Sequence, residues 1–352
     1  MARQITLKSG SIFNGNPITF SIIPSLAPHS SFHRVIVEVT CGMDGGDYET
    51  IKMSVPVYEE NIYGRVYIDI SSALRTFRDS YNYTPDTATY PIVKFCVWAY
   101  DEYMSDGEFC TRVGECVSPA QEDGETKYYY TLFGAFSDME RMASNEFKSV
   151  KAFSRKPTSA PELVAVGEEY VYTPPFAEEC TLLNSLSLTP PTSQKTLITT
   201  EGSQTINGVP IYALPETEAA NRQVFRFINS LGVLESVSVP KVYSKKRSVT
   251  SSSYAITRQE TFSTFSRSFV KKSNNREEWI FQTDPLNEDW QQWYLHEFLM
   301  SDYIWAHING QWVPCTITLD EDETYYDSTG NNPLTVSFTA KLDIDGSPML
   351  LK

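Results

Sequence analysis

Residues 334–342 read Leu-Thr-Val-Ser-Phe-Thr-Ala-Lys-Leu, with an apolar residue at every second position. Successive residues of a β-strand point to opposite faces, so this period of two predicts a strand with one buried and one solvated face. Residues 315–319 read Cys-Thr-Ile-Thr-Leu and alternate in the same way. We expect the two runs to pair as a long hairpin, joined through the acidic run 320–323 and the polar loop 328–333.

The same alternation recurs in the first third of the chain, at residues 35–39, 66–70 and 95–99. Aromatic residues make up 13% of the chain, and 20 Pro and 17 Gly punctuate its short segments, which is typical of strands separated by turns. These patterns predict a mainly β fold class, a multi-domain antiparallel β-sandwich or β-barrel protein with a few short helices.

Two helices are expected. Ser71 or Ser72 is the predicted N-cap of the first, because a hydroxyl side chain accepts a hydrogen bond from the exposed N–H groups of a first turn. Asp284 is the predicted N-cap of the second, over about residues 285–300, with Pro285 at its first helical position. Apolar residues at helical spacing mark the buried face of each helix. They are Ala73, Leu74 and Phe77 in the first, and Leu286, Trp290, Trp293 and Tyr294 in the second.

Composition divides the chain into three regions. Residues 1–155 are predicted to form an N-terminal β domain. Residues 156–220 are rich in Pro, Thr and Ser, including two Pro-Pro pairs, and we expect a connecting region with short strands. Residues 221–352 are predicted to form a C-terminal β domain that contains the Trp-rich helix.

The chain is acidic, with a formal net charge of -15 and a pI near 4.8. This charge disfavours binding to nucleic acid or to an anionic membrane. The N-terminus has no apolar signal segment, and no run reaches the roughly 18 apolar residues of a membrane span. We therefore expect synthesis in a cytoplasm, no nucleic-acid partner and no membrane insertion. In that setting the six cysteines are expected to be small buried hydrophobic residues, with a disulfide among Cys96, Cys110 and Cys116 as the alternative that spacing leaves open.

Motifs for chemistry are weak. No nucleophile elbow, phosphate-binding loop or dinucleotide fingerprint occurs in the sequence. His296 begins a segment like a zinc-protease motif, but Met300 stands where that chemistry needs a second His. The acidic run 320–323 offers oxygen ligands for Ca²⁺, yet Tyr325 and Asn331 occupy the positions where an EF-hand has Gly and Glu. We predict no catalytic residue, no cofactor and no metal site.

The C-terminal aromatic residues allow two interpretations. Exposed rings could stack on sugars, whereas Trp at helical spacing is more often part of a core or a subunit interface. We favour the core, because the helix must bury one face against the adjoining strands. The residues concerned are Trp290, Trp293, Tyr294, Tyr303, Trp305 and Trp312.

Positive charge is concentrated in residues 241–276, which hold nine basic residues and a single acid, Glu260. In so acidic a chain, this segregation indicates a surface that docks on an acidic neighbour, because complementary charges orient association. A nucleic-acid surface and a solvated strand face are the alternatives. The Phe residues at 262, 265 and 269 could anchor the contact or turn inward. The predicted partner-binding residues are Lys245, Lys246, Arg247, Arg258, Arg267, Lys271 and Lys272.

Residues 224–232 read Val-Phe-Arg-Phe-Ile-Asn-Ser-Leu-Gly, a strand-like run that ends at an Asn-Ser-Leu-Gly turn. Three shorter segments precede it: Asp-Ile-Ser with Leu-Arg within 69–75, Gly-Ala-Phe-Ser at 134–137, and Phe-Ser-Arg-Lys-Pro with Pro-Glu-Leu within 153–163. In this order the segments resemble tail proteins of phages and prophages of the Bacteroidetes. The resemblance spans about residues 65–343. This chain has Val233 where the turn of that family usually has a second Gly.

The resemblance implies a non-enzymatic virion structural protein near the distal end of a phage tail, as a distal tail protein, a baseplate component or a tail-tip adaptor. Its N-terminal β domain would form an oligomeric ring, hexameric by analogy, in contact with other tail proteins. The protein would be made in the host cytoplasm and end in the virion. Two alternatives stay open: a carbohydrate- or receptor-binding module of a phage tail, and a head–tail connector or neck protein.

Overall fold

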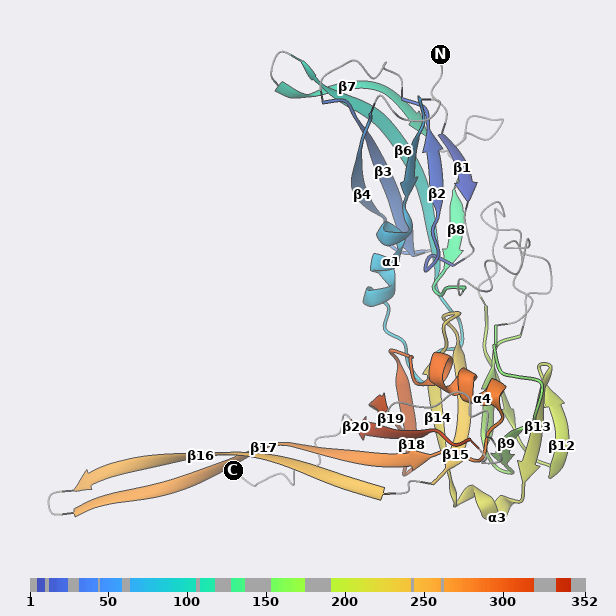
Figure 1. The fold of residues 1–352 in the computed structure, drawn as a ribbon, viewed down its shortest axis with the longest axis vertical. Coiled ribbons are helices and arrows are strands. Elements are labelled where there is room, and N and C mark those ends of the chain that lie inside the picture. The colour runs from blue at the N-terminus through green and yellow to red at the C-terminus, as the bar shows by residue number, and fades with distance from the viewer. Residues whose placement is uncertain are drawn as a thin grey trace. The chain divides into compact units, whose positions relative to one another are not determined.

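The structure is a computed structural model of the 352-residue chain. It describes residues 5–9, 13–24, 32–43, 45–58, 64–105, 108–117, 128–136, 153–174, 191–241, 244–260, 263–319 and 334–342, with the backbone alone at 9, 79–80, 105, 108–117, 247–260 and 263–277. The chain divides into two units (Figure 1). Unit 1 comprises residues 1–153, 173–193 and 230–233, and unit 2 comprises residues 154–172, 194–229 and 234–352.

Unit 1 contains two antiparallel sheets (Figure 1). The smaller has the order β1-β2-β5 and consists of β1 (Ile5–Ser9), β2 (Thr19–Ile22) and β5 (Val66–Asp69). The larger has the order β4-β3-β6-β7, with β8 also paired to β6; its strands are β3 (Arg34–Met43), β4 (Glu49–Pro56), β6 (Ile92–Ser105), β7 (Glu108–Val117) and β8 (Tyr129–Leu132). The alternating runs of the first third of the sequence therefore lie in strands, as predicted.

Aromatic rings fill the space between the two sheets of unit 1. Phe20 of β2 contacts Tyr129 of β8 edge to face, with ring centroids 5.7 Å apart. Tyr129 in turn stacks on Phe95 of β6 at 5.4 Å. All three residues are buried. The contact therefore joins the smaller sheet to the larger one, and gives the unit a common core.

The helix α1 (Ser71–Ser80) buries Ala73, Leu74 and Phe77, as predicted, but its cap differs from the prediction. Ser71 is already helical, and no side chain of the cap residue completes the first turn. Asp69 instead accepts hydrogen bonds from the backbone N of Ser71 at 2.9 Å and from Ser71 Oγ at 3.0 Å. A carboxylate reaches these donors from further back in the chain than a Ser hydroxyl would.

Unit 2 is built on a seven-stranded antiparallel sheet with the order β15-β14-β18-β19-β20-β17-β16. Its strands are β14 (Arg222–Ile228), β15 (Leu234–Pro240), β16 (Ser244–Glu260), β17 (Ser263–Gln282), β18 (Ile304–Ile308), β19 (Gln311–Leu319) and β20 (Ser337–Leu342). β19 and β20 pair from Cys315 opposite Leu342 to Leu319 opposite Phe338, which confirms the predicted pairing. The acidic run and polar loop between them lie outside the described residues.

The predicted core face of β20 is correct, but its second face is not fully solvated. β20 begins at Ser337, later than the predicted start at 334, and Val336 just before it is completely buried, as are Phe338 and Ala340, in agreement with the alternation. Thr339, which the alternation assigned to solvent, is also buried, with 5% of its surface exposed. The reason is the position of β20 between β17 and β19, because neighbours on both sides flank a residue of an interior strand.

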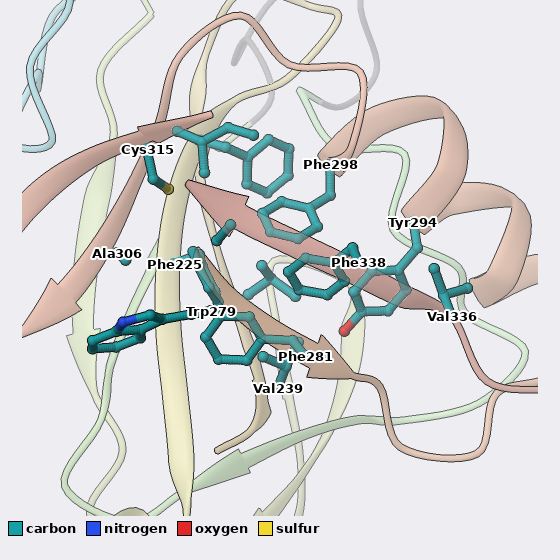
Figure 2. Packing of buried hydrophobic residues seen from close by; sticks show 14 of the residues in the cluster. Phe225, Val239, Trp279, Phe281, Tyr294, Phe298, Ala306, Cys315, Val336 and Phe338 are labelled. Carbon is teal, nitrogen blue, oxygen red and sulfur yellow. The ribbon is translucent and has the colours of Figure 1, made fainter. Parts of the chain in front are cut away.

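A cluster of aromatic rings forms the core of unit 2 (Figure 2). Phe338 stacks on Phe281 of β17 at 5.3 Å and meets Phe298 edge to face at 5.6 Å. Phe225 of β14 contacts the same three rings. Burying a large apolar side chain contributes about 1.5–3 kcal/mol, so these rings account for much of the stability of the unit.

The Trp-rich helix covers this core. It consists of α4 (Glu288–Trp293) followed by a π-helical turn (Tyr294–Phe298), and it starts later than predicted. Asn287 is the N-cap, and its Oδ1 accepts a hydrogen bond from the backbone N of Trp290 at 3.0 Å. Asp284, the predicted cap, instead accepts from Arg222 at 2.9 Å. The Asp284 carboxylate therefore pairs with the nearly buried Arg222 guanidinium and does not cap the helix.

Two small sheets complete unit 2. One has the order β12-β13-β9, in which β13 (Val209–Leu214) is antiparallel to β12 (Gly202–Ile206) and parallel to β9 (Glu162–Ala165). The other pairs β10 (Glu169–Tyr172) with β11 (Gln194–Leu197), and the short helix α3 (Glu216–Ala219) precedes β14. Because strands dominate and helices are short, the predicted mainly β class with several antiparallel sheets is confirmed.

Candidate functional site

The basic segment expected to bind a partner forms a long two-stranded hairpin (Figure 1, orange). β16 and β17 pair from Ser244 opposite Ile280 to Glu260 opposite Ser263. β17 pairs with β20 only over residues 278–282, so beyond this stretch its described strand partner is β16 alone. We call residues 248–260 and 263–276 the ribbon. At roughly 3.3 Å per residue, the ribbon is about 40 Å long.

Three of the predicted basic residues lie at the base of the hairpin. The Lys245 Nζ lies 3.7 Å from the centroid of the Trp279 ring, a cation–π contact at the edge of the core. The next two basic residues face acids across the strands, and opposite charges in such positions stabilise an antiparallel pair by about 0.2–1 kcal/mol. The pairs in register are Lys246 with Glu278 and Arg247 with Glu277.

The other four predicted residues lie along the ribbon. Arg258 is opposite Phe265, Arg267 opposite Ile256, Lys271 opposite Ser252, and Lys272 opposite Ser251. Together with Arg276, they give the ribbon five basic residues against one acid. None of these five basic residues has an acid opposite it, whereas two of the three basic residues at the base do.

A second concentration of charge is buried in unit 2. The Lys156 ammonium donates hydrogen bonds to Glu162 Oε2 at 2.7 Å, to Tyr170 Oη at 3.2 Å and to the carbonyl oxygen of Ser236. The Lys156 and Glu162 side chains are almost completely buried. All three ammonium donors therefore have acceptors, which offsets part of the cost of burying the positive charge. Burial raises the pKa of Tyr170 well above its usual range, which keeps the phenol protonated as a donor to Glu162.

Glu235 of β15 is the unusual member of this cluster. Its side chain is buried, and desolvation raises its pKa to about 7, although attraction to Lys156 and a hydrogen bond with Ser154 act in the opposite direction. A buried carboxyl with such a pKa could act as a proton donor or acceptor. Chemistry would also need room for a substrate beside it.

The space near the cluster is small. A cavity of ≈ 10 Å³ is lined by residues that include Glu162, Tyr170 and Ser236. A cavity of that volume holds about one water molecule, whereas sites for small-molecule ligands span roughly 300–1,000 Å³. We therefore regard the cluster as a structural feature that fixes β9 and β10 against β15.

In unit 1, two segments from distant parts of the sequence, each with a glycine, approach closely at their backbones. The backbone N of Ala135 donates to the carbonyl oxygen of Ser230 at 2.8 Å. A Cβ on Gly232 would lie 2.1 Å from the carbonyl oxygen of Phe133, and one on Gly134 would lie 2.7 Å from the carbonyl of Leu231. Both glycines have positive φ angles, +136° for Gly134 and +79° for Gly232. Only glycine fits at either position.

Most of the aromatic residues considered for sugar stacking belong to the core. Trp290, Trp293, Tyr294 and Trp305 are buried, and the first three pack in the cluster described above. Tyr303 and Trp312 are partly exposed. Arg226 lies over the Trp312 ring at 4.1 Å. The six residues therefore do not form one exposed platform.

The described residues that were considered for metal chemistry do not converge. His296 and Met300 are exposed on the surface of unit 2. Within the described ranges, no group of three or more His, Cys, Asp or Glu side chains could hold a metal ion. Cys41, Cys96 and Cys315 are buried thiols, and burial raises the pKa of Cys41 to about 12. The acidic run proposed for Ca²⁺ lies outside the described residues.

Comparisons with family models, curated proteins and solved structures gave no match to this chain. No helix in the described ranges is both long and apolar enough to cross a membrane.

Proposed function

We propose that this chain is a non-enzymatic structural subunit of a phage tail, near its distal end, which assembles with copies of itself into a ring and contacts other tail proteins. The observation that carries the proposal is the close backbone approach between the segments that contain Gly134 and Gly232. These glycines belong to two of the four segments on which the resemblance to tail proteins rests. Residues about a hundred positions apart thus have one joint structural reason to be glycine.

The surface features of the chain support an assembly role. The ribbon is long, and none of its five basic residues has an acid opposite it on the facing strand. The buried Lys156 ammonium is engaged by acceptors within the chain, beside a water-sized cavity. Both features fit a protein that works through its surfaces and its shape.

The burial of the Trp-rich helix weighs against the carbohydrate-binding alternative. Sugar stacking requires an exposed aromatic face, and the Trp290 and Trp293 rings pack inside unit 2. Only Tyr303 and Trp312 of the six candidates retain partial exposure. The structural role therefore accounts for more of the described residues.

Peptide mass spectrometry of purified particles, separated into capsid and tail fractions, tests this function. We expect the chain in the tail fraction, in several copies per particle. Detection with the capsid, or in a single copy per tail, would contradict the proposal. A ring also needs two different faces of each subunit to meet, so the copy number should match a closed symmetry.

A further inference from the structure

The ribbon has few internal means of stability. Its two strands pair with each other, and no further strand is paired with it among the described residues. A two-stranded hairpin by itself is at best marginally stable in water, because it buries little apolar surface. A second surface that covers one face of the ribbon would supply the missing burial.

The register sorts the residues of the ribbon into two unlike faces. Residues opposite each other in antiparallel strands share a face, and so do alternate residues along one strand. Over 250–260 and 263–273, one face combines aromatic, aliphatic and basic residues with the acid Glu260 and four Ser or Thr residues near its two ends, and we call it the aromatic–basic face. It holds Tyr254, Ile256, Arg258, Phe265, Arg267 and Phe269. Lys271 lies on this face nearer the base.

The second face, which we call the hydroxyl face, has a different chemistry. Apart from Val270 and Lys272, it consists of Ser, Thr, Ala and Gln residues. Aromatic residues and Arg are enriched in the centres of protein interfaces, whereas Ser and Ala are depleted there. The aromatic–basic face therefore has the composition of a docking surface, and the hydroxyl face has the composition of a solvated one.

We propose that the aromatic–basic face docks on an acidic surface of a second copy of this chain. Outside the ribbon, the sequence has 24 basic and 43 acidic residues, so each chain carries both partners of a complementary charge pair. Arg guanidinium groups bind carboxylates through paired hydrogen bonds, while Phe and Tyr add apolar contact.

A contact between the ribbon of one copy and another region of the next joins two different surfaces. Such a contact either closes into a ring or continues as an open filament. The inference thus rests on the self-assembly proposed above, and it names the element that reaches the neighbour. The acidic excess elsewhere repels phosphate, which makes nucleic acid the weaker candidate for the same face.

Paired variants of the full chain test the assignment of the face. The face variant carries Arg258→Ser, Arg267→Ser and Lys271→Ser. The control carries Ser253→Glu, Ser266→Glu and Ser268→Glu on the hydroxyl face, so each lowers the net charge by three. Circular dichroism checks that both variants keep the β content of the wild type.

Native mass spectrometry and sedimentation velocity then measure association. We expect the face variant to raise the dissociation constant at least about tenfold, and the control to leave it within about twofold, because the position of the charge decides complementarity. Raising NaCl from about 0.05 to 0.5 M should weaken wild-type association, since exposed charges are screened. Equal effects of the two variants would overturn the docking face.

Photo-cross-linking identifies the partner directly. A benzoylphenylalanine at Phe265 lies on the aromatic–basic face, and one at Ser266 lies on the hydroxyl face. In mixtures of ¹⁴N and ¹⁵N chains, the first should form mixed-isotope cross-links to Asp- and Glu-rich peptides, and the second should form few. Cross-links within one chain only, or bound nucleic acid that the face variant loses, would overturn the proposal.

The failure of the docking face and the failure of the ring give different results. A closed oligomer that the face variant leaves unchanged overturns the docking face and leaves the ring standing. Mixed-isotope cross-links from position 265 in an open filament support the docking face and overturn the ring. A chain that stays monomeric and forms no mixed-isotope cross-link contradicts both.

Discussion

Replacing Glu235 with Gln removes the ionisable group of this residue from the buried cluster of unit 2 and keeps the shape of the side chain nearly unchanged. Glu235 is buried in β15, and desolvation raises its pKa from 4.5 to about 7. Between these two values the folded chain holds a proton that the unfolded chain has released. Stability therefore falls as pH rises through this interval, because the native state binds more protons than the unfolded state.

The size of the effect follows from the pKa difference. One pKa unit corresponds to about 1.4 kcal/mol, so the rise from 4.5 to about 7 corresponds to about 3 kcal/mol. This contribution is fully present below pH 4.5 and is lost as pH approaches 7. The neutral amide of Gln has a similar shape and cannot ionise. We expect the Gln variant to be more stable than the wild type at pH 8, by up to about 3 kcal/mol.

Urea unfolding followed by Trp fluorescence, from pH 5 to pH 8, measures this difference. The wild type and the variant have all other carboxyl groups in common. The difference between their free energies of unfolding, plotted against pH, therefore reports on Glu235 alone. The control is Glu201→Gln, at an exposed residue. Its curve should parallel that of the wild type. If the Glu235 variant is no more stable than the wild type at pH 8, or keeps the same pH slope, the description of the cluster is wrong.

Two further substitutions test packing. Phe338→Ala should destabilise unit 2 by about 3–5 kcal/mol, because the ring is completely buried. The control Ser337→Ala should cost no more than about 0.5 kcal/mol. Equal shifts of the urea midpoint would show that the face of β20 is misassigned. Gly232→Ala combines a positive φ with a clash, and Gly208→Ala has the same φ of +79° with open space around it. The first should lower the melting temperature clearly more than the second, and similar losses would contradict the backbone contact with Phe133.

The strands were predicted from the local alternation of apolar and polar residues. Phe338, Val336 and Ala340 face the core as their spacing indicated, because the period of two is a property of the strand itself. The burial of Thr339 depends on which strands lie beside β20, and no local pattern contains that information. Sequence therefore located the core face and could not tell an interior strand from an edge.

The helix caps show a similar limit. Asp, Asn and Ser all accept hydrogen bonds from a first helical turn, so several residues near each start were plausible caps. Asp284 accepts a hydrogen bond from Arg222, and Asn287 caps the helix. The deciding partner lies 62 residues away in the sequence. Local propensity cannot identify an ion pair at that separation.

Charge counting found the basic segment, but the register was needed to interpret it. Glu277 and Glu278 follow the window of residues 241–276, and pairing of the strands brings them opposite Arg247 and Lys246. The division of the ribbon into two faces also depends on the register. The buried cluster of Lys156, Glu162 and Glu235 was not predicted, because the spacing of these residues follows no motif and their burial depends on how β9, β10 and β15 pack.

A reconstruction of the particle whose genome encodes this chain tests the central claim most directly. We predict a closed ring of several copies at the distal end of the tail, with six-fold symmetry, in which the ribbon of one subunit contacts the next. A single copy, or a position in the capsid shell, would contradict the account.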